Sequence, residues 1–276
     1  MKRKILSVIM VIAMILAAGA FTAGCGEDEA GPVEAYNKAA ENMSKADDVD
    51  LDGKIAVVIK AEGQSMEMGM DLNATMIKSE TDDPADLQMA MKMSMELMGQ
   101  KINTQTYIKD KTMYTDDGQG QKSRTEMDED SSEAFEKVFG GDVGKIDEYV
   151  KSSERDGETV KLVLDGEKAI KAAVEKMNEI GDDASEAVDM SQIEESLKNA
   201  GVKDINVTAN ISDENFTSLK FDVPMEMDMA AFNAALTGGS ASGASQKIKA
   251  DLTIDFSKIA VNSGAKIDFP DLSDYK

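Results

Sequence analysis

The chain has no histidine, no tryptophan and only one cysteine among its 276 residues. Without imidazole it cannot form a histidine-dependent catalytic triad, and with one thiol it has neither an internal disulfide nor a Cys/His zinc cluster. Aromatic residues make up 5% of the chain, which argues against surfaces that stack sugars or bases. Carboxylates are abundant but follow no catalytic motif. We therefore expect no catalytic residues, no metal site, no cofactor and no enzymatic activity.

Basic residues are also scarce, because 30 Lys and Arg stand against 53 Asp and Glu and give a net charge of −23. A surface this acidic repels phosphates, so the composition excludes binding to nucleic acid. Pro occurs 4 times and Gly 21 times, which does not fit a collagen-like or broadly disordered chain. With 42% hydrophobic and 30% charged residues, the composition is that of a soluble globular protein with a substantial core.

The N-terminal segment has the three parts of an export signal. It begins with the basic residues 2–4, continues with the uncharged apolar run Ile5–Ala20, and ends with small residues. Thr22-Ala23-Gly24-Cys25 resembles the lipobox of bacterial lipoproteins, in which the signal is cut before a cysteine that receives a diacylglycerol. Thr22 stands where leucine is usual. The alternative is a retained transmembrane anchor, since residues 5–24 are uncharged and just long enough to span a bilayer.

We predict a signal peptide at residues 1–24, a lipid on Cys25 with acyl chains such as palmitate, and an acidic tether at residues 25–31. Cleavage would remove three basic and no acidic residues, leaving 27 basic against 53 acidic and a net charge of −26. Two acyl chains hold a protein stably on a membrane. The expected location is therefore the extracytoplasmic face of a bacterial cell membrane, with the membrane as a partner through Cys25.

Methionine is frequent, with 20 copies, and its spacing is regular. From Leu87 to Leu97 every second residue is apolar, and four of these residues are methionines. Successive side chains of a β-strand point to opposite sides of the sheet, so this period predicts a strand with one methionine face. The same alternation occurs at 66–72 and 219–229. The candidate lining of a hydrophobic cavity comprises Met66, Met68, Met70, Met89, Met91, Met93, Met95, Phe221, Met225, Met227 and Met229.

These methionines have three candidate roles. They can fill the ordinary core between sheet and helices, because Met adapts to irregular gaps. They can line a deformable cavity that repacks around ligands of different shape. They can also bind Cu(I) through their thioethers, an interpretation that the absence of His and of a free Cys weakens.

The rest of the chain reads as strands interrupted by helices. Pro32–Lys45 is predicted to be a helix with Pro at its first position and one apolar stripe. Short, turn-like connections then indicate an antiparallel meander. The predicted strands are Val49–Ala61, Ser65–Lys78, Leu87–Met98, Ile102–Lys109, Thr112–Thr115, Gln121–Met127, Glu158–Leu164, Val202–Ile211, Phe216–Met229 and Lys247–Phe256, with Ala265–Phe269 as a candidate last edge strand.

Between the two groups of strands, helices are predicted at Ser131–Phe139, Val143–Lys151, Glu167–Ile180 and Ser191–Ala200. We expect residues 32–276 to form a single domain with this helical insert at about 131–200. The alternative is two halves joined near residue 155. The expected fold class is α+β and β-dominated, an antiparallel sheet of about 9–11 strands with helices packed on one face.

The layout resembles the LolA/LolB and LppX-like superfamily of bacterial envelope lipoproteins and lipoprotein carriers. The likeness rests on the lipobox with Cys25, the helix before the sheet, residues 106–114 with a tyrosine on each side of a turn, and the turn into a strand at 211–217. The resemblance implies a curved, unclosed antiparallel β-barrel with helices on the concave side. It also implies a concave apolar cavity able to hold acyl chains.

An acidic run resembles the start of a calcium-binding loop. Asp48, Asp50 and Asp52 are followed by Gly53, as in such loops, but the twelfth position is Ile59, where a bidentate Glu is required. The three carboxylates also share the parity of a strand's polar face, so we expect a solvated strand start.

Together these patterns predict a membrane-anchored extracytoplasmic lipoprotein that binds a hydrophobic or amphiphilic, lipid-like ligand in a methionine-lined cavity. The alternative is a structural or interaction lipoprotein of the cell envelope with a fully packed core and no small-molecule ligand.

Overall fold

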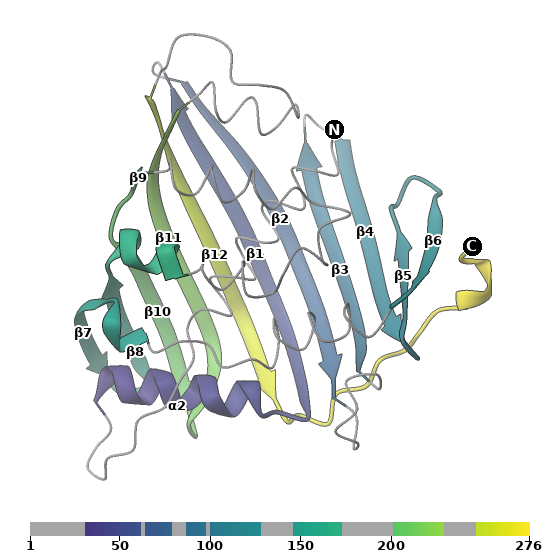
Figure 1. Cartoon of the computed structure of the whole chain (residues 1–276), viewed down its shortest axis with the longest axis horizontal. Helices are drawn as coiled ribbons and strands as arrows, with labels where there is room; N and C mark the ends of the chain where they lie inside the picture. The colour runs from purple at the N-terminus through teal and green to yellow at the C-terminus, as the bar shows by residue number, and fades with distance from the viewer. Residues whose placement is uncertain are drawn as a thin grey trace.

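The computed structural model describes residues 31–61, 64–78, 87–97, 100–127, 146–172, 201–228 and 247–276, and most of them form one antiparallel sheet (Figure 1). The strands are β1 (Asp48–Ala61), β2 (Gln64–Ile77), β3 (Gln88–Leu97), β4 (Gln100–Lys109), β5 (Thr112–Asp116), β6 (Lys122–Glu126), β7 (Val150–Asp156), β8 (Thr159–Leu164), β9 (Gly201–Val202), β10 (Ile205–Ser212), β11 (Asn215–Asp228) and β12 (Lys247–Val261).

The twelve strands follow the order β6-β5-β4-β3-β2-β1-β12-β11-β10-β8-β7, and β9 pairs with β11. Most neighbours are consecutive in the chain, as in a meander, but β1 pairs with β12 and so joins the two ends of the sequence. The sheet runs from β6 to β7 without closing into a barrel. This confirms the expected β-dominated, open antiparallel sheet. The methionine strand β3 lies nearer one edge, and β1 occupies the centre of the sheet.

The helix α2 (Pro32–Ser44) packs on the sheet. Pro32 takes the first helical position, where its missing N–H needs no partner. The buried face of the helix carries Ala35, Tyr36, Ala39 and Ala40, which contact β11, β8, β10 and β7. The small alanines let the helix lie close to the sheet, and the ring of Tyr36 meets Phe216 edge-on at 5.0 Å.

Two local predictions are wrong. Val143–Lys151 was expected to be helical, but its described part is a 3-10 helix at Ile146–Glu148 followed by the start of β7. Ala265–Phe269 was expected to be an edge strand but forms no strand. The predicted helix Glu167–Ile180 is helical as far as it is described, up to residue 172. The rest of it, and the predicted helices Ser131–Phe139 and Ser191–Ala200, lie outside the described residues.

The C-terminal segment 262–276 leaves β12 and crosses one end of the sheet towards β5 and β6 (Figure 1). The ring of Phe269 lies 6.2 Å from that of Tyr107 on β4, and Tyr275 meets Tyr114 on β5 edge-on at 5.6 Å. The backbone N–H of Arg124 on β6 donates to the carbonyl of Lys276. This segment is therefore attached to the face that carries Tyr107 and Tyr114.

Candidate ligand-binding face

The methionines of β2 and β3 lie directly opposite one another on one face of the sheet. The strand register pairs Met70 with Met95 and Met76 with Met89. Leu72 pairs with Met93, so an apolar residue faces each methionine at these positions. The alternation in the sequence therefore brings two methionine rows together, as expected from the period of two.

The third methionine strand, β11, does not touch these two. It is separated from β2 by β12 and β1. A continuous cross-strand row nevertheless connects the three, and it runs through Phe221, Ile254, Ile55, Met70 and Met95. Met225 lies further along β11 on the same face, because it alternates with Phe221 and Val223.

Burial varies along the rows. Met70, Met89, Met93 and Met95 are buried, with at most 5% of their surface exposed. Met68, Met91 and Met225 are partly buried and pack against the core. Met66, near the start of β2, is 52% exposed. The side chain of Met227 and the whole of Met229 lie outside the described residues.

The helix and the methionine rows lie on different parts of the sheet. α2 packs on β7, β8, β10 and β11, whereas β2 and β3 lie beyond β12 and β1 (Figure 1). Met70, Met93 and Met95 still belong to the same hydrophobic cluster as the buried residues of α2. The methionine face is therefore continuous with the core, which also supports the interpretation that these side chains fill it.

Residues that the sequence did not single out complete this face. Ile55 and Val57 on β1 and Ile102 on β4 lie beside the methionines in the strand register. Their signal was present as apolar residues at alternate positions. Only the pairing of β1 with β2 and of β4 with β3 shows that they share a face with the methionines.

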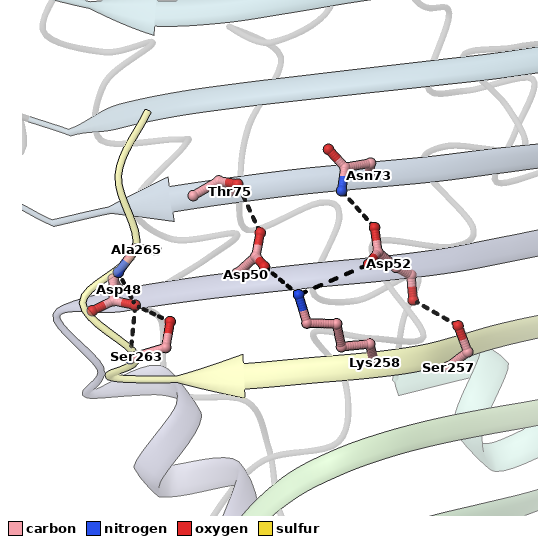
Figure 2. Close-up of polar contacts among 9 residues, drawn as sticks. All are labelled: Asp48, Asp50, Asp52, Asn73, Thr75, Ser257, Lys258, Ser263 and Ala265. Atoms are coloured by element: carbon pink, nitrogen blue, oxygen red, sulfur yellow. Dashed lines mark hydrogen bonds and ion pairs between the residues drawn. The ribbon is translucent and has the colours of Figure 1, made fainter. Parts of the chain in front are cut away.

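The three aspartates at the start of β1 bind protein groups and form no calcium loop (Figure 2). Asp50 accepts hydrogen bonds from Lys258 Nζ at 2.7 Å and from Thr75 Oγ1 at 2.8 Å. Asp52 accepts one from Asn73 and lies 4.0 Å from Lys258 Nζ. These residues also lie in an extended strand, whereas a calcium loop wraps around its ion.

Asp48 is buried and holds the segment after β12. Its carboxylate accepts hydrogen bonds from the backbone N–H groups of Ser263, Gly264 and Ala265 and from the Ser263 hydroxyl, at 2.9–3.2 Å. Burial raises the pKa of Asp48, but these hydrogen bonds together outweigh burial and leave the pKa below its ordinary value. The expectation of a solvated strand start is therefore wrong for Asp48.

The described residues contain no group of three or more His, Cys, Asp or Glu side chains placed to hold a metal ion. Among the same residues, no helix is long and apolar enough to cross a membrane. Cys25 lies outside them, so its predicted lipidation stays a prediction.

Comparison with known proteins gives one family match. The family model that matches residues 32–272 is described as a family of unknown function, DUF6612. No curated protein matches the chain.

Several solved structures match most of the chain. A LolA superfamily protein, NE2245 from Nitrosomonas europaea, is 10% identical, with 87% of this chain and 96% of that chain covered and a TM-score of 0.23. A DUF1329 family protein from Desulfovibrio piger is 10% identical, with 86% and 95% covered and a TM-score of 0.27. An outer membrane lipoprotein-sorting protein domain from Vibrio parahaemolyticus is 8% identical, with 86% and 94% covered and a TM-score of 0.27.

A LolA superfamily protein is thus among the proteins that this chain is similar to, and that is the superfamily whose resemblance was stated from the sequence. With identities of 8–10% and TM-scores of 0.23–0.27, these structures do not bear on the function of this chain.

Proposed function

The chain belongs to the DUF6612 family, whose function is unknown, and we propose that it is a lipid-anchored extracytoplasmic lipoprotein that binds a lipid-like ligand. The ligand is hydrophobic or amphiphilic and lies against the methionine face of β2 and β3. The observation that carries this proposal is the pair of methionine rows on the part of the sheet away from α2. No catalytic step is part of the proposal.

Methionine suits such a surface better than a branched, less flexible apolar side chain does. Its unbranched chain has three rotatable bonds and a polarisable sulfur, so it repacks around acyl chains of different length. Exposure increases from the buried methionines to the partly buried Met91 and Met68 and then to the exposed Met66, so part of the methionine face is accessible to a ligand. The export signal and Cys25 would hold the protein at a membrane, where lipids are available.

A second candidate function has its own support. Because Met70, Met93 and Met95 lie in the same packed cluster as α2, the face can be core, and the protein can act as an interaction lipoprotein without a small-molecule ligand. The two functions differ in whether the purified protein contains or takes up a lipid.

The deciding experiment uses residues 26–276, purified without the anchor. Native mass spectrometry should detect a co-purifying lipid-like molecule, and a fluorescent fatty acid should bind. Apoprotein that contains no ligand and fails to take up the fatty acid would overturn the ligand proposal and favour the interaction function.

A matched pair of substitutions on one strand then locates the binding. Met91→Glu places a charge on the methionine face, and Ala90→Glu places the same charge on the opposite face of β3; both positions are half-buried. We expect Met91→Glu to weaken fatty-acid binding by about tenfold, because a charge next to an acyl chain is poorly solvated. Ala90→Glu should leave it unchanged. Equal effects in both variants, with circular dichroism showing intact strands, would place the ligand elsewhere.

A further inference from the structure

The face of the sheet opposite the methionines carries a polar groove of about 480 Å³ across β1, β2, β3 and β4. Its floor is formed by two rows of cross-strand neighbours. One row contains Asp52, Asn73, Lys92 and Gln105, and the other contains Lys54, Asp71, Ser94 and Asn103.

Two lysines elsewhere on this face are paired with carboxylates. Lys60 Nζ lies 2.8 Å from Asp251, and Lys258 Nζ lies 2.7 Å from Asp50. In the groove, by contrast, Lys54, Asp71 and Lys92 form no ion pair or hydrogen bond within the part of the chain that the structure describes.

The missing pair between Lys54 and Asp71 is notable because the two residues are direct cross-strand neighbours. The Lys54 side chain leans over Gly69, where its Cε lies 3.5 Å from the position that a Cβ would occupy. The absence of a side chain at Gly69 therefore gives Lys54 room to lie away from the Asp71 carboxylate.

Other polar groups in the groove are held by neighbours. Asp52 is engaged by Asn73 and Lys258. The Tyr107 hydroxyl donates to Gln105 Oε1 at 2.5 Å, and the Tyr107 ring packs against Phe269. Because its carbonyl is held, the Gln105 amide keeps its NH₂ group as a donor with a fixed orientation.

We propose that this groove binds a small zwitterion, with its anionic group on Lys54 and Lys92 and its ammonium group on Asp71. A simple anion would be repelled by Asp71 and by the net charge of −23, and a simple cation, although attracted by that net charge, would be repelled in the groove by the two lysines. A zwitterion complements the charges of Lys54, Lys92 and Asp71 in the groove, and Ser94 and Gln105 supply hydrogen bonds. The groove volume falls within the range of small-molecule sites, roughly 300–1,000 Å³.

This site lies on the opposite face from the methionines and does not depend on the function proposed above. The zwitterion can be a soluble molecule or the head group of a lipid such as phosphatidylethanolamine, since both present the same charges.

The test follows amide resonances of ¹⁵N-labelled residues 26–276 during addition of O-phosphorylethanolamine. Resonances of the groove residues should shift and saturate, whereas inorganic phosphate or ethanolamine alone should bind more weakly by roughly tenfold, because each supplies half of the complementary charge. The proposal would be overturned if millimolar phosphorylethanolamine caused no shift at the groove. It would also be overturned if inorganic phosphate or ethanolamine alone bound as tightly as phosphorylethanolamine.

Charge-matched variants provide the control. Lys92→Gln and Asp71→Asn should each weaken binding by about fivefold, the size expected for one exposed charge contact. Lys249→Gln on β12 and Glu67→Gln on β2 make the same charge changes on the same face outside the groove and should leave binding unchanged. An equal loss in the control variants would show a nonspecific charge effect and overturn the site.

Vesicles distinguish the two sources. Shifts or broadening of groove resonances with phosphatidylethanolamine vesicles, but not with phosphatidylglycerol vesicles, would support a lipid head group. Binding of phosphorylethanolamine without an effect of either vesicle would support a soluble zwitterion.

Discussion

Asp48 shows how one buried carboxylate can hold a whole segment of the chain. Four hydrogen bonds from residues 263–265 converge on it, and three of them come from consecutive backbone N–H groups. Figure 2 shows those from Ser263 and Ala265. An amide cannot accept from all of these donors, because its nitrogen would face N–H groups. We expect Asp48→Asn to lower the free energy of unfolding by about 2 kcal/mol and to speed hydrogen exchange at residues 263–276. The exposed neighbour Asp47 provides the control, since Asp47→Asn should change neither measurement.

The same carboxylate should make stability depend on acid. The pKa of Asp48 is lowered in the folded protein, so its contribution is fully present above the ordinary value of 3.8 and is lost as the pH falls through the lower, folded value. In urea titrations below about pH 4, the wild type should therefore lose more stability than Asp48→Asn does. Parallel pH profiles for the two proteins would contradict this role.

Tyr36 poses the opposite case, a buried hydroxyl without a hydrogen-bond partner among the described residues. Burial strongly raises the pKa of Tyr36, so the group stays a neutral phenol. Tyr36→Phe removes the unsatisfied oxygen but keeps the ring against Phe216, and we expect unfolding free energy to stay equal or rise by up to about 1 kcal/mol. Tyr107→Phe removes a hydroxyl that donates to Gln105 and should cost about 1 kcal/mol. A similar loss for both variants would show that Tyr36 has a partner, such as a buried water.

At the scale of strands, the pairing of β1 with β12 depends on a glycine. The ring of Phe256 lies over Gly53, so that a Cβ there would approach Phe256 Cδ1 to 2.8 Å and the carbonyl oxygen of Asp255 to 3.0 Å. The register also shifts between Asp52 and Gly53. Gly53→Ala should therefore destabilise the protein by about 1–3 kcal/mol, measured by urea unfolding. Gly69→Ala on β2 meets nothing closer than 3.5 Å and should be neutral or slightly stabilising. Equal effects at the two glycines would show that Phe256 is free to move.

The elements that sequence patterns predicted well are those with one buried face. Alternating apolar residues gave most strands within a few residues, including β8, whose buried positions alternate as Val160, Leu162 and Leu164. The sequence pattern did not predict β7, because after Val150 this strand carries only polar residues and both of its faces are exposed. The segment 265–269 has strand-like composition, but Asp48 and Tyr107 hold it by side-chain contacts instead.

The methionine face could be predicted from the sequence and the polar groove could not, because local patterns reveal only side chains that share a face within one strand. The methionine rows could be found because local alternation fixes which side chains share a face. The polar groove could not, because Asp52, Asn73, Lys92 and Gln105 meet only through the registers of four strands. Strand register and the pairing of β1 with β12 depend on which distant segments of the chain pair, and local periodicity does not give this information.

At the scale of the whole molecule, the two faces of the sheet differ in polarity. One face carries the methionine rows, and the other carries the groove and the segment attached through Asp48, Phe269 and Tyr275. A lipid on Cys25 would place both faces within a short tether of the bilayer, because six residues separate Cys25 from Pro32. Both proposed ligands, an acyl chain and a zwitterionic group, occur together in membrane lipids.

That placement depends on lipidation of Cys25, which can be tested in a bacterium expressing the full chain with an alkyne analogue of palmitate. We expect the wild type to incorporate the label and to have an intact mass that lacks residues 1–24 but carries the lipid. Cys25→Ser should incorporate no label and should not be cleaved before position 25, because the acylated thiol is gone. Thr22→Leu supplies the residue usual in a lipobox and should label at least as strongly as the wild type. An unlabelled wild-type protein that retains residues 1–24 would instead identify residues 5–24 as a transmembrane anchor, long enough to span the bilayer.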